Sequence, residues 1–178
     1  MFNRTIKRIA RYVFFILLII QIVLLFLKHF FELYLLWDIV PYILGYIILF
    51  SVFFIFNKSK IRNFMIYPVL IILILIYSFR FILRSEEKDF YFKSPRGTNT
   101  IIIEECTFLL GGWSNVYIPK YVIFKKLLPQ YNISADNGGR PFTNNDYSMN
   151  WKSENVVVIK YDSYTGTNNI KTITISLK

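Results

Sequence analysis

Cysteine and histidine are nearly absent from this chain of 178 residues, which contains one of each, Cys106 and His29. A single cysteine cannot form a disulfide within the chain, and a zinc site needs several cysteine or histidine ligands. Acyl-transfer catalysis needs a nucleophile with a base in reach, and the only histidine precedes the C-terminal serines and Cys106 by a long stretch of chain. We therefore expect no catalytic triad, no metal centre and no cofactor.

Acidic residues are also scarce, with 11 Asp and Glu against 21 Lys and Arg and a net charge of +10. The excess is confined to one half of the chain. Residues 1–84 contain ten basic and two acidic residues, whereas residues 85–178 contain eleven and nine. Positive charge that flanks apolar segments is typical of membrane topology signals. This distribution predicts a lipid bilayer as partner and argues against a nucleic acid.

Charge is missing altogether from three long segments, residues 12–27, 39–56 and 64–79. A helix needs about 20 apolar residues to cross the hydrocarbon core. With flanking residues added, the segments predict three transmembrane helices at about 12–31, 39–56 and 64–83. Buried helices of a soluble core are the alternative, but the rest of the chain offers nothing to cover them.

The loops between these spans differ in charge. Residues 1–11 contain four Lys and Arg and residues 57–63 contain three, whereas the connection 28–38 contains one together with two acids. The positive-inside rule then predicts a multi-pass cell-membrane protein with a cytoplasmic N-terminus and an extracytoplasmic C-terminal half. An extracytoplasmic domain without disulfides is typical of a Gram-positive bacterium. The basic start also fits a signal peptide, but no small-residue cleavage site follows it.

Three details of the first half are open to test. The connection 28–38 either extends the first span or lies on the membrane surface, and Phe30, Leu33 and Trp37 have the spacing of one helical face. We expect Pro41 in the first turn of the second span, where a missing N–H costs little. Pro68 is expected near the first turn of the third span.

The C-terminal half, residues 85–178, is rich in β-branched residues and turn signals. It predicts a small all-β domain of about six or seven strands, an antiparallel meander or sandwich. In residues 170–177 apolar side chains alternate, so Ile173, Ile175 and Leu177 are expected to face inward. Gly111–Gly112 and Gly138–Gly139 are expected in turns. The predicted strands are 98–106, one or two within 115–124, 148–152, 156–161 and 170–177, with 125–132 ambiguous.

A short pattern in this half resembles a known type of module. Ser94-Pro95-Arg96-Gly97 precedes a strand and is followed by Trp151 and the run 156–161. This Ser-Pro-x-Gly…Trp…Val-x-Ile pattern is similar to one found in β-propeller blades and in small membrane-anchored proteins of Gram-positive bacteria. One unit is too little for a propeller. The resemblance to the membrane-anchored group implies no known chemistry.

Two adjacent glutamates, Glu104 and Glu105, lie in a predicted strand and should point to opposite faces, so they cannot form one acid/base pair. One of them combined with Asp136 or Asp146 would be the basis of an envelope hydrolase. The alternative is a solvated strand edge for one glutamate and a local ion pair or hydrogen bond for the other. Cys106 is expected to be a small apolar strand residue.

Three functions remain in view. The leading hypothesis is a non-enzymatic envelope binding or accessory module whose partner is a membrane or envelope protein or a peptide. The second is a membrane-embedded partner or immunity-type protein that acts through its helices, and the third is the carboxylate-based hydrolase. Aromatic and basic side chains near the loops are the expected partner contacts: Trp113, Tyr117, Tyr121, Arg140, Phe142, Tyr147 and Trp151.

Overall fold

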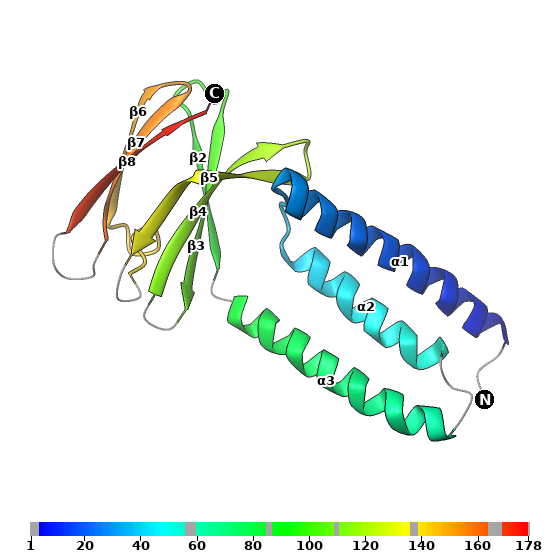
Figure 1. Ribbon diagram of the computed structural model, residues 1–178. Coiled ribbons are helices and arrows are strands. Elements are labelled where there is room, and N and C mark those ends of the chain that lie inside the picture. Colours follow the sequence, from blue (N-terminus) through cyan, green and yellow to red (C-terminus); the bar gives the residue numbers. More distant parts are fainter. Residues whose placement is uncertain are drawn as a thin grey trace. The chain divides into compact units, whose positions relative to one another are not determined.

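The computed structural model describes residues 4–55, 60–84, 87–108, 111–135, 139–163 and 169–177. The chain divides into two compact units, Met1–Ile82 and Leu83–Lys178. The first unit is helical and the second is built of strands (Figure 1). The composition change expected near residue 85 therefore coincides with a structural boundary, and each unit is described by itself.

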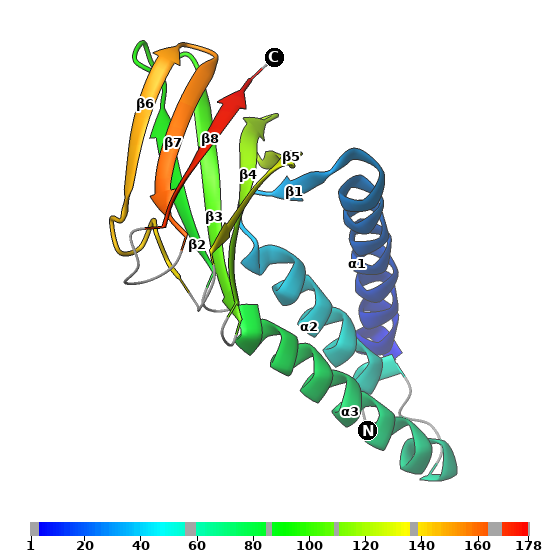
Figure 2. The same ribbon diagram turned by 60° about the vertical axis from the view of Figure 1, so that its left-hand side comes forward.

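The helical unit contains α1 (Arg4–Phe31), β1 (Leu33–Leu35), α2 (Ile39–Ile55) and α3 (Lys60–Arg84). In Figures 1 and 2 α2 lies between α1 and α3. Two helices contain segments long and apolar enough to cross a membrane, Lys7–Phe31 and Ile66–Leu83. The third predicted span, α2, has 17 residues, about 26 Å at 1.5 Å per residue. Two of the three predicted spans are thus of full membrane length.

The connection 28–38 extends the first helix only as far as Phe31, and the rest of it is not helical. At Glu32 the backbone turns into the left-handed region with φ of 56°, and Leu33–Leu35 is extended as β1. Because an extended segment has a period of two, the predicted helical face of Phe30, Leu33 and Trp37 was wrong. The carbonyl of Trp37 accepts a bond from the Val40 N–H at 3.1 Å, immediately before the body of α2.

The third helix begins earlier than the sequence indicated. It starts at Lys60, so residues 60–63 are helical although they were predicted to belong to a basic loop. The rest of that loop, residues 57–59, lies outside the described residues. Pro68 consequently lies inside α3, two turns beyond its start, and not in the first turn. Membrane helices tolerate an internal proline because neighbouring groups satisfy the freed carbonyl.

Aromatic side chains join α2 to α3. The hydroxyls of Tyr46 and Ser78 lie 2.8 Å apart, and the Tyr77 hydroxyl donates to the carbonyl of Pro41 at 3.0 Å. Pro41 lies in the first turn of α2, as predicted. A Cβ at Gly45 would lie 2.2 Å from the Tyr77 oxygen, so this glycine makes room for the tyrosine.

The described residues of the second unit form seven strands in two antiparallel sheets (Figure 2). In one sheet β5, β4, β3 and β2 lie in that order, and in the other β6, β7 and β8 do. Each sheet joins neighbouring strands in chain order, so each is a meander. The strands are β2 (Lys88–Lys93), β3 (Thr100–Phe108), β4 (Gly111–Lys120), β5 (Phe124–Ala135), β6 (Tyr147–Ser153), β7 (Val156–Asp162) and β8 (Ile170–Ser176).

A single apolar cluster lies between the two sheets. Its fully buried members come from both: Ile101, Ile103, Val116 and Ile133 from one sheet, and Val157, Ile159 and Ile175 from the other. Ile173 and Leu177 pack against the cluster, so the predicted inward face of the last strand is confirmed. The two meanders therefore form the predicted small sandwich.

The glycine pair at the start of β4 was expected to break a strand, and this was wrong. Gly111 and Gly112 pair with Phe108 and Thr107 in the ladder of β3 and β4. A Cβ at Gly112 would lie 2.5 Å from the carbonyl oxygen of Gly139, so glycine is needed for the close approach of that loop. The ambiguous segment 125–132 forms the greater part of β5.

We predict that Ile159→Ala lowers the free energy of unfolding of this unit by about 2–5 kcal/mol, because it leaves a cavity between the sheets. Ile170→Ala removes the same atoms from a side chain that is 65% exposed and should change stability by less than about 0.5 kcal/mol. Urea unfolding of the full chain in detergent, followed by tryptophan fluorescence, measures both. Equal losses for the two variants would contradict the assignment of the core.

Candidate functional site

The seven predicted partner contacts differ widely in exposure. Tyr121 and Trp113 are exposed, at 67% and 39%. Tyr117 and Phe142 are buried, at 2% and 1%, and offer no surface to a partner. The remaining three are partly buried: Arg140, Tyr147 and Trp151.

Phe142 fills the core from a loop. Its ring centroid lies 5.0 Å from that of Tyr147 and 5.9 Å from that of Phe90. The Glu105 carboxylate holds this loop by accepting bonds from the N–H groups of Phe142, at 2.9 Å, and Thr143, at 3.1 Å, and from the Thr143 hydroxyl. Glu105 is therefore an anchor for the segment that brings Phe142 between the sheets.

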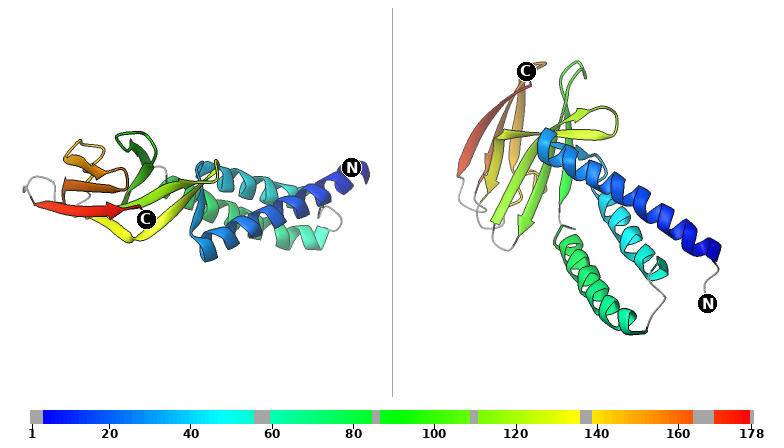
Figure 3. Two further views of the ribbon diagram at one scale, coloured as in Figure 1. Left: turned by 90° about the horizontal axis from the view of Figure 1, so that it is seen from above. Right: turned by 45° about the vertical axis from the view of Figure 1, so that its right-hand side comes forward.

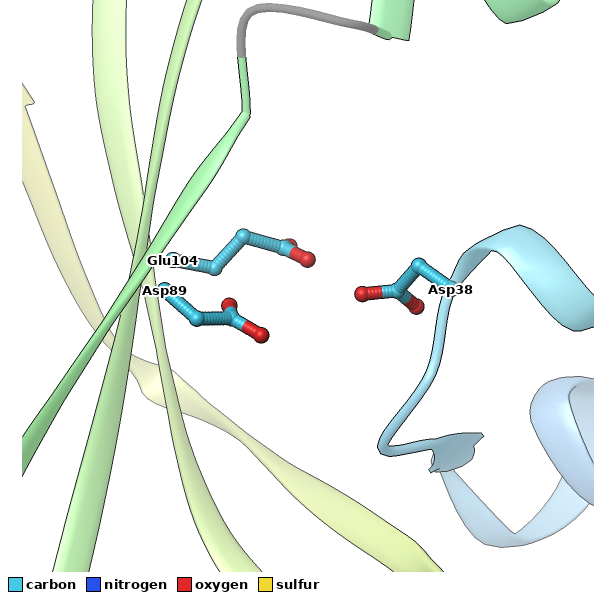
Figure 4. A group of neighbouring side chains, drawn as sticks. All are labelled: Asp38, Asp89 and Glu104. Carbon is cyan, nitrogen blue, oxygen red and sulfur yellow. The ribbon is translucent and has the colours of Figure 1, made fainter.

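On the opposite face of β3, Glu104 belongs to a buried cluster of four residues, which we call the Lys125 cluster: Asp89, Glu104, Tyr117 and Lys125. The Lys125 ammonium lies 2.9 Å from Glu104 Oε1 and 3.2 Å from Asp89 Oδ1. The Tyr117 hydroxyl donates to Glu104 Oε2 at 2.8 Å. Figure 4 shows Asp89 and Glu104 on neighbouring strands; Asp38, also labelled there, belongs to the helical unit.

The glutamates point to opposite faces, as predicted, but the expected solvated strand edge was wrong because Glu104 and Glu105 are 3% and 2% exposed. Two charges removed from water persist only when they are paired and hydrogen-bonded. The Lys125 ammonium provides the positive charge that both carboxylates need. The ion pair between Lys125 and Glu104 was not predicted from the sequence, because Lys125 lies in the segment 125–132, which has no clear strand pattern.

The Ser-Pro-x-Gly pattern forms a turn that is tied to the other sheet. Glu154 Oε2 accepts bonds from the hydroxyls of Ser94 and Thr98, both at 2.6 Å, and Oε1 accepts from the Arg96 N–H at 3.0 Å. The hydrogen bond from Ser94, followed by that from Thr98, lowers the pKa of the Glu154 carboxyl below its ordinary value. Gly97 provides the left-handed turn with φ of 72°. This pattern thus joins the two sheets at their turns.

A shallow groove of about 290 Å³ opens at one end of the three-stranded sheet, where β6 begins and β7 ends. The Asp162 N–H donates to the carbonyl of Asp146 at 3.0 Å and joins two residues of its lining. Burial raises the pKa of Tyr161, so its hydroxyl remains protonated at neutral pH. The lining combines both charges with aromatic rings: Asp146, Tyr147, Ser148, Lys160, Tyr161, Asp162 and Ile170.

Of the carboxylates proposed for a hydrolase, Glu105 holds the loop described above. Asp146 is exposed and lines the groove, and Asp136 lies outside the described residues. Cys106 is buried in β3 at 3% exposure, as predicted. The groove was not predicted, since pairing of Tyr147 with Tyr161 across β6 and β7 brings together residues that share no local motif.

Comparison of the chain with protein families, with curated proteins and with solved structures gave no match. Two features of the sandwich face solvent and can reach a partner: the groove on the three-stranded sheet and the exposed turn between β4 and β5.

We predict that Lys125→Met lowers the free energy of unfolding by about 3–5 kcal/mol, because it leaves two carboxylates without their buried cation. The double variant Lys125→Met with Glu104→Leu should lose less free energy of unfolding than the sum of the losses in the two single variants, by about 1–3 kcal/mol. Urea unfolding of the four members of the cycle measures this coupling. Lys152→Met, at an exposed position of β6, is the control and should change stability by less than about 0.5 kcal/mol. Additive effects would show that the pair is not coupled.

We predict that Glu154 makes the stability of the sandwich sensitive to acid. Because the folded state lowers its pKa below the ordinary 4.5, its contribution is complete above pH 4.5 and is lost as the pH falls through the lowered value. Glu154→Gln should be less stable than the wild type at neutral pH, and the difference should narrow in acid. Urea unfolding midpoints of both proteins, measured from neutral pH to below pH 4.5, test this prediction. A difference between the two midpoints that does not change with pH would contradict the role of the Glu154 carboxylate.

Proposed function

We propose that this chain is a membrane-anchored, non-enzymatic binding module. Its helices hold it in the cell membrane, and its β sandwich lies outside the cytoplasm and binds a peptide or protein of the envelope. The observation that carries the proposal is the groove at the end of the three-stranded sheet, with its charges of both signs.

Three features support the membrane part of the proposal. Two helices have the length and composition of membrane spans. α2 carries no charge, and its 17 residues lie at the lower end of the range of about 17–25 that crosses a bilayer, so we propose it as the third span. The basic residues in the first turns of α1 and around residue 60 favour a cytoplasmic N-terminus by the positive-inside rule.

The chemistry of the groove supports a peptide or protein as ligand. Its volume of about 290 Å³ is at or below the small end of cofactor and drug pockets, which span about 300–1,000 Å³. It has room for one or two side chains of a larger partner. Lys160 and the two aspartates provide charges of both signs.

The buried and bound carboxylates support a binding role over a hydrolytic one. Glu104 holds Lys125, Glu105 holds the loop at Phe142, and Glu154 holds the turn at Ser94. Each of these groups already makes the interactions that stabilise it. A general acid or base must instead reach a proton of the substrate.

A second candidate function is the membrane-embedded partner or immunity-type role. Gln21, in the middle of α1, has a buried side-chain oxygen that finds no hydrogen-bond partner among the described residues. A polar side chain in this position can join a helix of another protein, at about 0.6–2 kcal/mol per bond. This candidate predicts that function survives removal of the sandwich and is lost in Gln21→Leu.

The groove is tested by Ser148→Arg, which adds a long side chain to its lining. Asn150→Arg is the matched control, because Asn150 is also exposed on β6, two residues along the strand and outside the lining. We expect Ser148→Arg to weaken retention of envelope peptides on the full chain in nanodiscs by about tenfold or more, as blocking a central contact does. The control should retain them. Equal retention by both variants would contradict binding in the groove.

The orientation is tested separately by reporters fused after Lys178. A reporter active only outside the cytoplasm should be active, and a cytoplasmic one inactive. The opposite result would overturn the proposed topology and, with it, an envelope ligand for the groove.

A further inference from the structure

The turn between β4 and β5 presents three consecutive apolar side chains to solvent. Tyr121, Val122 and Ile123, which we call the hairpin tip, are 67%, 94% and 43% exposed. A single exposed apolar side chain on a soluble surface needs no explanation, but a contiguous group marks an interaction site.

The backbone of the tip is held in an uncommon conformation. Tyr121 and Val122 have φ of 51° and 50°, in the left-handed region that a β-branched residue such as valine rarely adopts. The N–H of Ile123 donates to the carbonyl of Tyr121 and closes a tight turn. Glycine or asparagine would relieve this strain, yet the turn is built from bulky apolar residues, which favours a role for their side chains.

Basic residues flank the tip and acidic residues are missing from the hairpin around it. Residues 116–130 contain Lys120, Lys125 and Lys126 and no Asp or Glu. Lys125 is paired with the carboxylates of the Lys125 cluster. Lys120 is exposed, and its ammonium lies 5.4 Å from the centroid of the Tyr121 ring. Lysine beside exposed aromatic and aliphatic side chains is the composition that binds an anionic lipid surface.

The hairpin also departs from the sheet to which it belongs. The register of β4 and β5 shifts between Asn115 and Tyr117, and such a bulge bends and twists a strand. In Figures 1 and 3 the end of the hairpin, in yellow-green, projects away from β2 and β3. The tip is thus free of the packing between the two sheets.

We propose that the hairpin tip inserts into the headgroup region of an anionic membrane as a second anchor for the sandwich. The occupant is lipid because the same chain contains two helices of membrane length, so a bilayer is always within reach of the tethered unit. Val122 and Ile123 enter the interface, Tyr121 lies at headgroup level and Lys120 contacts lipid phosphates. The tip and the groove use different sheets, so this inference does not depend on the proposed ligand.

The test places a nitroxide at Val122→Cys in a Cys106→Ala background of the full chain, reconstituted in vesicles of phosphatidylcholine and phosphatidylglycerol. Thr172→Cys, exposed on β8, is the control. We expect the ratio of oxygen to water-soluble nickel collisions to be about threefold or more higher at the tip, since the interface favours the apolar reagent. Lys120→Gln with Lys126→Gln, or vesicles without phosphatidylglycerol, should lower that ratio toward the control.

Two outcomes would overturn the proposal. Equal ratios at both sites would show that the tip is in water, and protection of the tip from both reagents would show that a protein, a second copy or a partner, covers it. Hydrogen exchange on the unmodified chain provides a second reading if Cys106→Ala does not fold. Amides 121–124 should exchange more slowly in nanodiscs with phosphatidylglycerol than in nanodiscs of phosphatidylcholine alone, and equal rates would count against lipid contact.

Discussion

The alternation of β3 at Glu104 and Glu105 is the constraint on which the sandwich depends. Successive side chains of a strand leave from opposite faces, so one glutamate enters the space between the sheets and the other leaves from the outer face. Inside, Glu105 fixes the loop that carries Phe142 into the core. Outside, Glu104 binds Lys125 across β4. A shift of register by one residue would exchange the two carboxylates and leave both without partners.

This use of the glutamates explains why the function is expected at the surface. Buried ionic groups are costly to desolvate, and each is retained here with a full set of partners. At the surface, charged side chains of both signs line the groove, where pairing of β6 with β7 brings residues of the two strands together. Three consecutive apolar side chains are exposed at the hairpin tip. The sandwich thus supports two surfaces of opposite character.

Features with a local signal could be predicted from the sequence, and features set by long-range pairing could not. The uncharged segments of the sequence predicted α1, α2 and α3. The alternation of apolar side chains predicted β8 with Ile175 facing inward. Gly112 was predicted to lie in a turn. Glycine is required there because the carbonyl oxygen of Gly139 leaves no room for a Cβ, and Gly139 is distant in the sequence. The partners of Lys125 are equally distant. The tip at Val122 was missed because a left-handed valine runs against local preference.

Charge is distributed unevenly within the sandwich, and this asymmetry connects its two surfaces. Residues 85–178 contain eleven basic and nine acidic residues, yet residues 116–130 contain three basic residues and no acid. The acids are correspondingly concentrated elsewhere, and Asp146 and Asp162 lie in the groove. An anionic bilayer attracts the basic hairpin over a distance of about one Debye length, whereas the groove, with two aspartates and Lys160, gains nothing from approaching it. The proposed contact of the tip with lipid would therefore favour orientations in which the groove faces away from the membrane.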